Sequence, residues 1–324
     1  MNTSWPSPPA GALGATLVAV HVAITLAMPV LMVGLVNRSK AWWAGRRGPP
    51  LLQLGWDLLR LLRKEPVFSH TSTALFRAGP WVVLGATLLA AQMAPVLGPM
   101  APLQFGHDFI VFAYTLGLAR LFLMLSAMDV GSSFEGMGSA REASFTAFIE
   151  PALFLLLGTA LVASGQTSFA GLVGYWTATP GLAWLAAPAL AVLLVLLQAE
   201  AARGPVDDPL THLELTMVHE VMVLDHSGPE LAAMQYAAAL KMTLVAGLMA
   251  ALLNPFSLHT QPALAVAARL AILVAVAVLV GTVESLVARL RLRHVPAYLA
   301  AASLLAALCL AAAGWYAHGM AGAA

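Results

Sequence analysis

The sequence predicts an all-α integral membrane protein with about eight transmembrane helices and amphipathic helices at one membrane surface. Two observations on composition lead to this class: 60% of the 324 residues are hydrophobic and 10% are charged, whereas soluble domains carry about 25% charged residues. A third is that the apolar residues are grouped into long runs. Polar groups are too few to cover such a chain in water, which argues against a soluble enzyme or a disordered chain. With a net charge of +1, no global field would attract nucleic acid.

Eight apolar runs are long enough to cross a bilayer, because a spanning helix needs about 20 mostly apolar residues. In chain order they are 12–36, 75–97, 107–128, 143–163, 182–201, 234–253, 263–287 and 296–318. The first run follows no basic segment and is too long for the apolar core of a signal peptide, so a cleaved leader is not expected. No internal repeat is clear, which weakens a transporter built from inverted halves. We expect one membrane domain over residues 1–324.

Basic residues lie in alternate connections between these runs. The connections at 98–106, 164–181 and 254–262 contain no Lys or Arg. Since Lys and Arg are enriched in cytoplasmic loops, the charged connections are predicted to be cytoplasmic, and both termini are predicted to lie outside. These cytoplasmic loops are about 37–74, 129–142, 202–233 and 288–295.

Residues 51–65 are predicted to form a first amphipathic helix at the cytoplasmic surface. One face is polar and another is lined with leucine, as expected of a helix that lies in the membrane interface. The polar residues are Gln53, Asp57, Arg60 and Lys64, and the apolar ones are Leu51, Leu54, Leu58, Leu61 and Leu62. Such a helix either anchors the protein to lipid or docks or lines a site for a cytoplasmic partner.

Residues 206–228 are predicted to form a second helix, because Asp208 and Pro209 make a good helix start and Gly228 a plausible stop. Three histidines would recur every seven residues along it, and its acids make it the most acidic part of the chain. These residues are His212, His219 and His226, and Asp207, Asp208, Glu214, Glu220 and Asp225. Successive imidazoles would lie about 10 Å apart, too far to share a metal ion. The histidine row therefore either takes part in proton handling or partner contact, or forms a solvated polar face of the helix.

Charged residues also occur inside the apolar runs, where each costs about 2.5–3.5 kcal/mol on insertion scales. They either form ion pairs that fix helix packing or line a hydrated path for protons or cations, and we favour the path. Glu142 and Glu150 are eight residues apart, about 12 Å in height near one helix face, and could relay a proton through water. For residues near span ends, snorkelling to the surface is an alternative. The in-span charges are Arg120, Glu150, Glu200, Lys241, Arg269 and Glu284.

The single cysteine, Cys309, lies in an apolar run and has no partner for an internal disulfide. No cysteine cluster could hold zinc or an iron–sulfur centre. We therefore expect that this chain binds no cofactor and that, in a redox machine, the metal centres would lie on partner subunits.

Three motifs resemble the membrane subunit that anchors respiratory complex I, in the form found in formate hydrogenlyase and hydrogenase-4. The first is residues 199–228, where six positions match the complex I pattern, whereas Leu210, His212 and three added residues are typical of the hydrogenase branch. The second is GMGSAREASFTAFIEP at 136–151. The third is RRGPPLLQLGWDLLRLLRKE at 46–65, where Leu54 replaces the usual proline. The six matching positions are Glu200, Arg203, Pro205, Asp207, Glu214 and Asp225.

The resemblance implies a subunit of the bacterial or archaeal plasma membrane that is not catalytic by itself but belongs to an oxidoreductase complex. Such a subunit holds hydrogenase-like large and small subunits with [NiFe] and iron–sulfur centres and joins them to antiporter-like membrane subunits. Buried glutamates of the family begin a proton path. With the in-span charges, the candidate path comprises Glu142, Glu150, Glu200, Arg120, Lys241, Arg269 and Glu284. Candidates for coupling and docking are Arg203, Asp207, Asp208, His212, Glu214, His219, Glu220, Asp225, Arg141, Asp57 and Lys64.

Two other functions stay open at this point. One is a quinone-reducing NADH dehydrogenase-type subunit with a quinone tunnel, which the departures at Leu210 and His212 disfavour. The other is a stand-alone ion transporter, which the acidic cytoplasmic loop and the resemblance disfavour. The transported ion is expected to be a proton or sodium. Membrane lipids are the remaining expected partner, and nucleic acid is not expected.

Overall fold

The computed structural model describes residues 12–98, 101–179, 182–207, 217–256 and 261–321, and within these ranges the chain is helical with no strand. Eight helices are long and apolar enough to cross a membrane, so the predicted fold class and number of spans are confirmed. These helices are α1 Ala12–Trp43, α3 Ala74–Met93, α4 Asp108–Asp129, α5 Ser133–Ser164, α7 Ala183–Glu200, α9 Gly228–Leu253, α10 Pro262–Leu286 and α11 Val295–Ala321.

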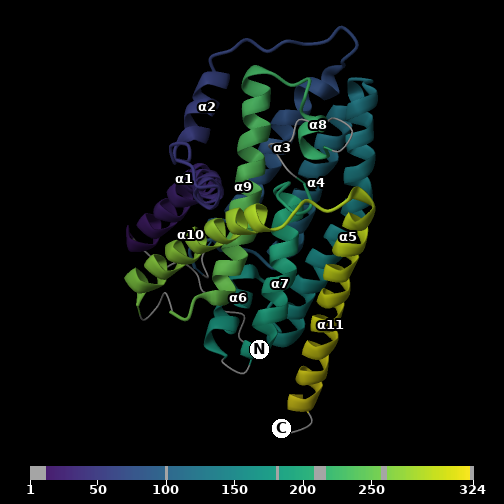
Figure 1. Ribbon diagram of the computed structural model, residues 1–324. Coiled ribbons are helices and arrows are strands. Elements are labelled where there is room, and N and C mark those ends of the chain that lie inside the picture. Colours follow the sequence, from purple (N-terminus) through teal and green to yellow (C-terminus); the bar gives the residue numbers. More distant parts are fainter. Residues whose placement is uncertain (1–11, 99–100, 180–181, 208–216, 257–260, 322–324) are drawn as a thin grey trace.

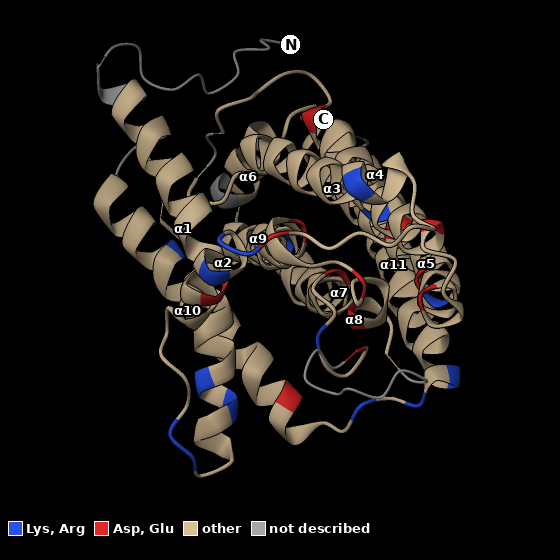
Figure 2. Cartoon of the chain, turned by 90° about the horizontal axis from the view of Figure 1, so that it is seen from above, with Lys and Arg blue, Asp and Glu red and all other residues tan. Residues whose placement is uncertain are grey.

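Helix α9 lies in the middle of the bundle, with α1, α3, α7 and α10 packed around it (Figures 1 and 2). The short helices α2 (Gln53–Leu61) and α8 (His219–Met222) lie beside the first turns of α9, at the top of Figure 1. We call this the polar end of the bundle. Helices α5 and α11 run side by side along the flank of the bundle that lies away from α1 and α10. A side chain on α9 is therefore surrounded by protein, which is why most of this helix is buried.

Helices α1 and α10 cross closely at Gly281. A Cβ atom at this position would overlap Ser39 of α1, so only glycine allows the two helices to approach this far. The same crossing places Glu284, three residues further along α10, beside the end of α1.

Helix α5 begins ten residues before the predicted span, and the expected cytoplasmic loop at 129–142 is therefore mostly helix. Apolarity marks only the membrane-embedded part of a helix, whereas the polar first turns of α5 are stabilised by packing against α8. Gly138 makes this contact possible, because a Cβ there would lie 3.0 Å from the carbonyl oxygen of Val218. Glu142 and Arg141 thus lie on the same rigid helix as Glu150.

The predicted helix over 206–228 is wrong in its described part. Residues 208–216, with Asp208, His212 and Glu214, lie outside the described residues. The Asp207 carboxylate accepts hydrogen bonds from the backbone N–H groups of Val218 (3.3 Å) and His219 (2.9 Å). This contact folds the chain back on itself and caps a single turn, α8. Gly228, with φ of +56°, begins α9 instead of ending a helix. His219 and His226 therefore share no helical face.

Two shorter helices complete the described fold. Helix α2 confirms the first amphipathic helix, and Gln53 donates to both carboxylate oxygens of Asp57 at 3.0 Å. Helix α6 (Phe169–Ala178) lies in a segment that the sequence predicted as a connection. Its ten residues are too few to span a bilayer, and Ser168 caps its start by accepting from the N–H of Gly171 at 3.1 Å.

Candidate functional site

Arg120 in the middle of α4 lies among three carboxylates. Its Nε is 3.2 Å from Oε1 of Glu142, its Nη1 is 3.3 Å from Oε1 of Glu150, and its Nη2 contacts Oε1 of Glu200. The side chain of Arg120 is 2% exposed, and that of Glu200 is 4% exposed. A buried charge persists only when it is paired, so helices α4, α5 and α7 are tied together by one guanidinium group.

Lys241 of α9 is a second buried cation beside these acids. It lines a small cavity of about 10 Å³ together with Glu142, Glu200 and Asp207. We call Arg120, Glu142, Glu150, Glu200 and Lys241 the Arg120 cluster. It contains two cations and three carboxylates, and interacting groups of this kind share protons as a set. The cluster thus places three carboxylates beside two cations inside the bundle.

Glu150 differs from the other acids of the cluster because 42% of its side chain is exposed. It faces the outside of the bundle against Gly117, from a helix that the membrane surrounds. An ionisable group in this position needs water or a polar neighbour. Glu150 thus connects the buried cluster with the flank of the molecule.

Asp207 links the cluster with the connection between α7 and α9. Besides capping α8, it forms an ion pair with Arg289, whose Nη2 lies 2.7 Å from Oδ1 of Asp207. Arg141 of α5 holds the same connection by donating to the carbonyl oxygen of Met217 at 2.8 Å. Asp207 and Arg141, both predicted as docking residues, thus hold the described part of this connection against the bundle.

Glu284 of α10 is turned inward and pairs with two cations. Its Oε2 lies 2.8 Å from Nζ of Lys40, and its Oε1 lies 3.7 Å from Nη1 of Arg203. Glu284 and Glu200 are each less than a tenth exposed, so neither side chain snorkels to the surface. They lie in two separate ion-pair groups at the polar end.

A larger cavity of about 290 Å³ lies between α1, α2, α9 and the α7–α9 connection. Its polar lining comprises Asn37, Asp57, Arg203, His219, Glu220 and Gln235. Asp57 lines this cavity although 41% of its side chain is exposed, which favours the interpretation of α2 as a helix that lines a site. Lys64, at the other end of the predicted polar face, is exposed beyond α2.

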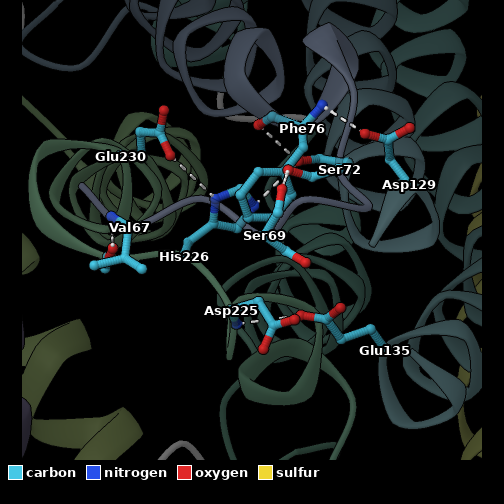
Figure 3. A network of polar contacts seen from close by, with 11 residues as sticks. Val67, Ser69, Ser72, Phe76, Asp129, Glu135, Asp225, His226 and Glu230 are labelled. Carbon is cyan, nitrogen blue, oxygen red and sulfur yellow. Dashed lines mark hydrogen bonds and ion pairs between the residues drawn. The ribbon is translucent and has the colours of Figure 1, made fainter. Parts of the chain in front are cut away.

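A third group of polar contacts surrounds His226 and was not predicted (Figure 3). The ring stacks on Phe76 at 3.9 Å, Nε2 lies 3.0 Å from Oγ of Ser126, and Nδ1 lies 3.7 Å from Oε2 of Glu230. Glu135 accepts a hydrogen bond from the N–H of the neighbouring Asp225 at 3.2 Å. Burial lowers the pKa of His226 to about 4, so the ring is neutral at neutral pH.

Acidification is expected to destabilise the protein through His226. The unfolded ring, with a pKa of 6.5, binds a proton that the folded ring with a pKa of about 4 does not. The free energy of unfolding therefore falls as pH drops through this window, by about 1 kcal/mol per pH unit, and is unaffected by this group above it. Thermal unfolding in detergent at about pH 7 and about pH 5 measures the effect. His226→Phe keeps the ring stack and should show a smaller pH difference; an unchanged difference would contradict this assignment.

Arg269 lies apart from the other charged candidates. It lies seven residues after the start of α10 at Pro262, far from the polar end. Its Nη1 donates a hydrogen bond to the carbonyl oxygen of Pro95 at 2.9 Å. Through this bond it holds the chain that follows α3. Among the described residues, no group of three or more His, Cys, Asp or Glu side chains is placed to hold a metal ion.

Fold and charge placement together define a multi-pass α-helical membrane protein with a buried, titratable charge cluster. The chain belongs to the family described as NADH dehydrogenase, whose model matches residues 15–315. It is 30% identical to hydrogenase-4 component C of Escherichia coli K12, over 75% of this chain and 76% of that protein. It is 28% identical to formate hydrogenlyase subunit 4 of the same organism, over 89% of this chain and 98% of that protein. The resemblance drawn from the three motifs is thereby confirmed.

A solved structure shares the fold. It is that of the membrane-bound sulfane sulfur reductase, an archaeal respiratory membrane complex, and one of its chains aligns with a TM-score of 0.77 and 20% identity. The alignment covers 93% of this chain and 99% of that chain. The bundle described above is thus a fold found in respiratory membrane complexes.

Proposed function

We propose that this protein is the membrane subunit of an energy-converting complex of the hydrogenase or formate hydrogenlyase type. In this role it anchors a peripheral redox arm and couples electron transfer to translocation of protons or sodium. The observation that carries the proposal is the Arg120 cluster inside the bundle. Its members Glu142, Glu200 and Lys241 line the same small cavity as Asp207 of the α7–α9 connection. The two Escherichia coli relatives support the hydrogenase assignment.

The proposal assigns a partner to each side of the molecule. The polar end faces the cytoplasm of a bacterium or archaeon, both termini lie outside, and the chain acts as one membrane domain. Hydrogenase-like large and small subunits, with their [NiFe] and iron–sulfur centres, dock at the polar end. Antiporter-like membrane subunits contact the flank where Glu150 is exposed.

Coupling would begin with a change of charge in the peripheral arm. A negative charge near a carboxylate strengthens its hold on a proton, and Asp207 lies where such a change would be felt. Asp207 reaches both Arg289 at the surface connection and the small cavity that Glu142 and Glu200 line. Protons would pass from these acids to Glu150, which contacts the same guanidinium group of Arg120. From Glu150 they would pass to the neighbouring subunit.

Glu150→Gln is expected to reduce proton translocation about tenfold or more while leaving assembly intact. The amide keeps the size of the side chain and can still accept from Arg120, but it cannot carry a proton. The measurement is proton translocation per electron-transfer turnover by the whole complex in proteoliposomes. Glu65→Gln, at an exposed acid beyond α2, is the matched control. Full translocation by the Glu150 variant would show that the path runs elsewhere.

The larger cavity favours one alternative function, reduction of a quinone. Its lining by Arg203, His219 and Asp57 together with leucine and methionine side chains would suit an amphipathic ring. Copurifying subunits distinguish the two functions, because a [NiFe] partner supports the first and quinone-dependent electron transfer supports the second.

A further inference from the structure

Two cavities at the polar end share a common wall. The larger one, of about 290 Å³, is lined by residues of α1, α2 and α9, and the smaller one, of about 10 Å³, by members of the Arg120 cluster. Among the described residues, Ala202 and His219 are the two that line both. Because alanine carries no group that can bind a proton, His219 is the described residue that offers a titratable side chain in this wall.

The position of His219 is fixed by its own backbone. Its N–H donates to Oδ2 of Asp207 at 2.9 Å, and it begins the single turn of α8. Asp207 is itself held by Arg289. The contacts that close the connection onto the bundle therefore also place the backbone of His219 at the wall between the cavities.

The larger cavity suits water. Its polar lining and its volume satisfy the two conditions for hydration, which are room for a molecule and several polar partners. Asp57, Arg203 and Glu220 line this cavity together with His219. Lys241, Glu142, Glu200 and Asp207 line the smaller cavity with it. Water in the larger cavity would therefore meet His219 on the side away from the buried acids.

The ring is neutral at neutral pH. Burial, followed by the charge of Lys241, lowers the pKa of His219 to about 4. A neutral imidazole has one nitrogen that accepts a hydrogen bond and one that donates. It can therefore take part in proton transfer at both nitrogens without remaining charged in a place that disfavours a cation.

We propose that His219 relays protons between the water of the larger cavity and the carboxylates of the Arg120 cluster. One ring nitrogen accepts a proton from a cavity water, which regains one from the water outside the protein, and the other nitrogen releases its proton to an ionised carboxylate of the smaller cavity. The ring ends as the other neutral tautomer, and rotation returns it to the first. This inference rests on the proposed function, because it supplies the step by which protons reach the cluster.

The test uses the intact complex in proteoliposomes. His219→Gln is expected to lower proton translocation per turnover about tenfold or more, because an amide of similar size does not exchange protons. His219→Ala is expected to show the same loss and to recover translocation when imidazole is added, since free imidazole can occupy the space left in the wall. A purely structural role would not respond to imidazole.

His70→Gln is the matched control, because His70 is an exposed histidine that lines neither cavity. It should translocate protons like the unaltered complex. If Glu150→Gln loses translocation and His219→Gln does not, the relay is overturned while the path stands. Loss without imidazole rescue in His219→Ala overturns the relay as well. If the unaltered complex moves sodium and no protons, the relay is overturned while the proposed function stands; if it moves neither ion, the proposed function itself fails.

Discussion

Arg120→Met is expected to lower the yield and the thermal stability of the folded protein sharply. The change leaves Glu142, Glu150 and Glu200 facing one another with Lys241 as the cation that lines their cavity. Breaking a buried pair by removing one partner costs about 3–5 kcal/mol, and native proteins are stable by only about 5–15 kcal/mol. The yield of monodisperse protein after detergent extraction and its thermal midpoint measure the loss.

Arg63→Met provides the control, because Arg63 is an exposed arginine just beyond α2. It should leave yield and thermal midpoint unchanged. Adding Glu142→Gln and Glu200→Gln to the Arg120 variant should restore part of the yield, because the unpaired negative charges are then removed. An Arg120→Met protein as stable as the unaltered one would show that the three contacts contribute nothing to folding.

Asp207→Ala is expected to release the α7–α9 connection and, with it, the peripheral arm. The variant loses the ion pair to Arg289 and both hydrogen bonds to the start of α8. Hydrogen bonds to charged groups are worth about 1.5–3 kcal/mol each. Without them, the single turn of α8 is expected to lose its place against the bundle. Hydrogen exchange across residues 217–227 should increase, and fewer peripheral subunits should copurify.

Asp225→Ala separates this effect from a general loss of acidity. The Asp225 side chain is exposed, and its backbone N–H, which bonds to Glu135, is retained in the variant. Exchange across 217–227 should therefore stay slow. Normal protection and a full set of copurifying subunits in the Asp207 variant would contradict the proposed anchoring role.

The sequence predicted the features that depend on composition. Apolar runs of about 20 residues reveal spanning helices because the membrane imposes the same requirement on each of them. The family could also be recognised, since motifs such as residues 199–228 are local in sequence. The cost of burying Arg120, Lys241 and Glu200 correctly marked them as residues that need partners.

The pairing of those charges could not be predicted, because it depends on how helices pack. Arg120 and Glu200 are eighty residues apart, and nothing in either neighbourhood specifies the other. The break in the expected helix over 206–228 has a similar cause. Asp207, at the start of that range, accepts hydrogen bonds from the backbone N–H groups of Val218 and His219, and this contact outweighs helix propensity.

Figure 1 shows α9 as a single uninterrupted rod through the centre of the molecule. Glu230 in its first turn faces His226, whereas Lys241, eleven residues later, reaches the Arg120 cluster. At 1.5 Å per residue the two side chains are about 16 Å apart along a stiff axis. Because an α-helix is stiff along its axis, a shift of α9 at Glu230 would also move Lys241 relative to the three carboxylates around Arg120.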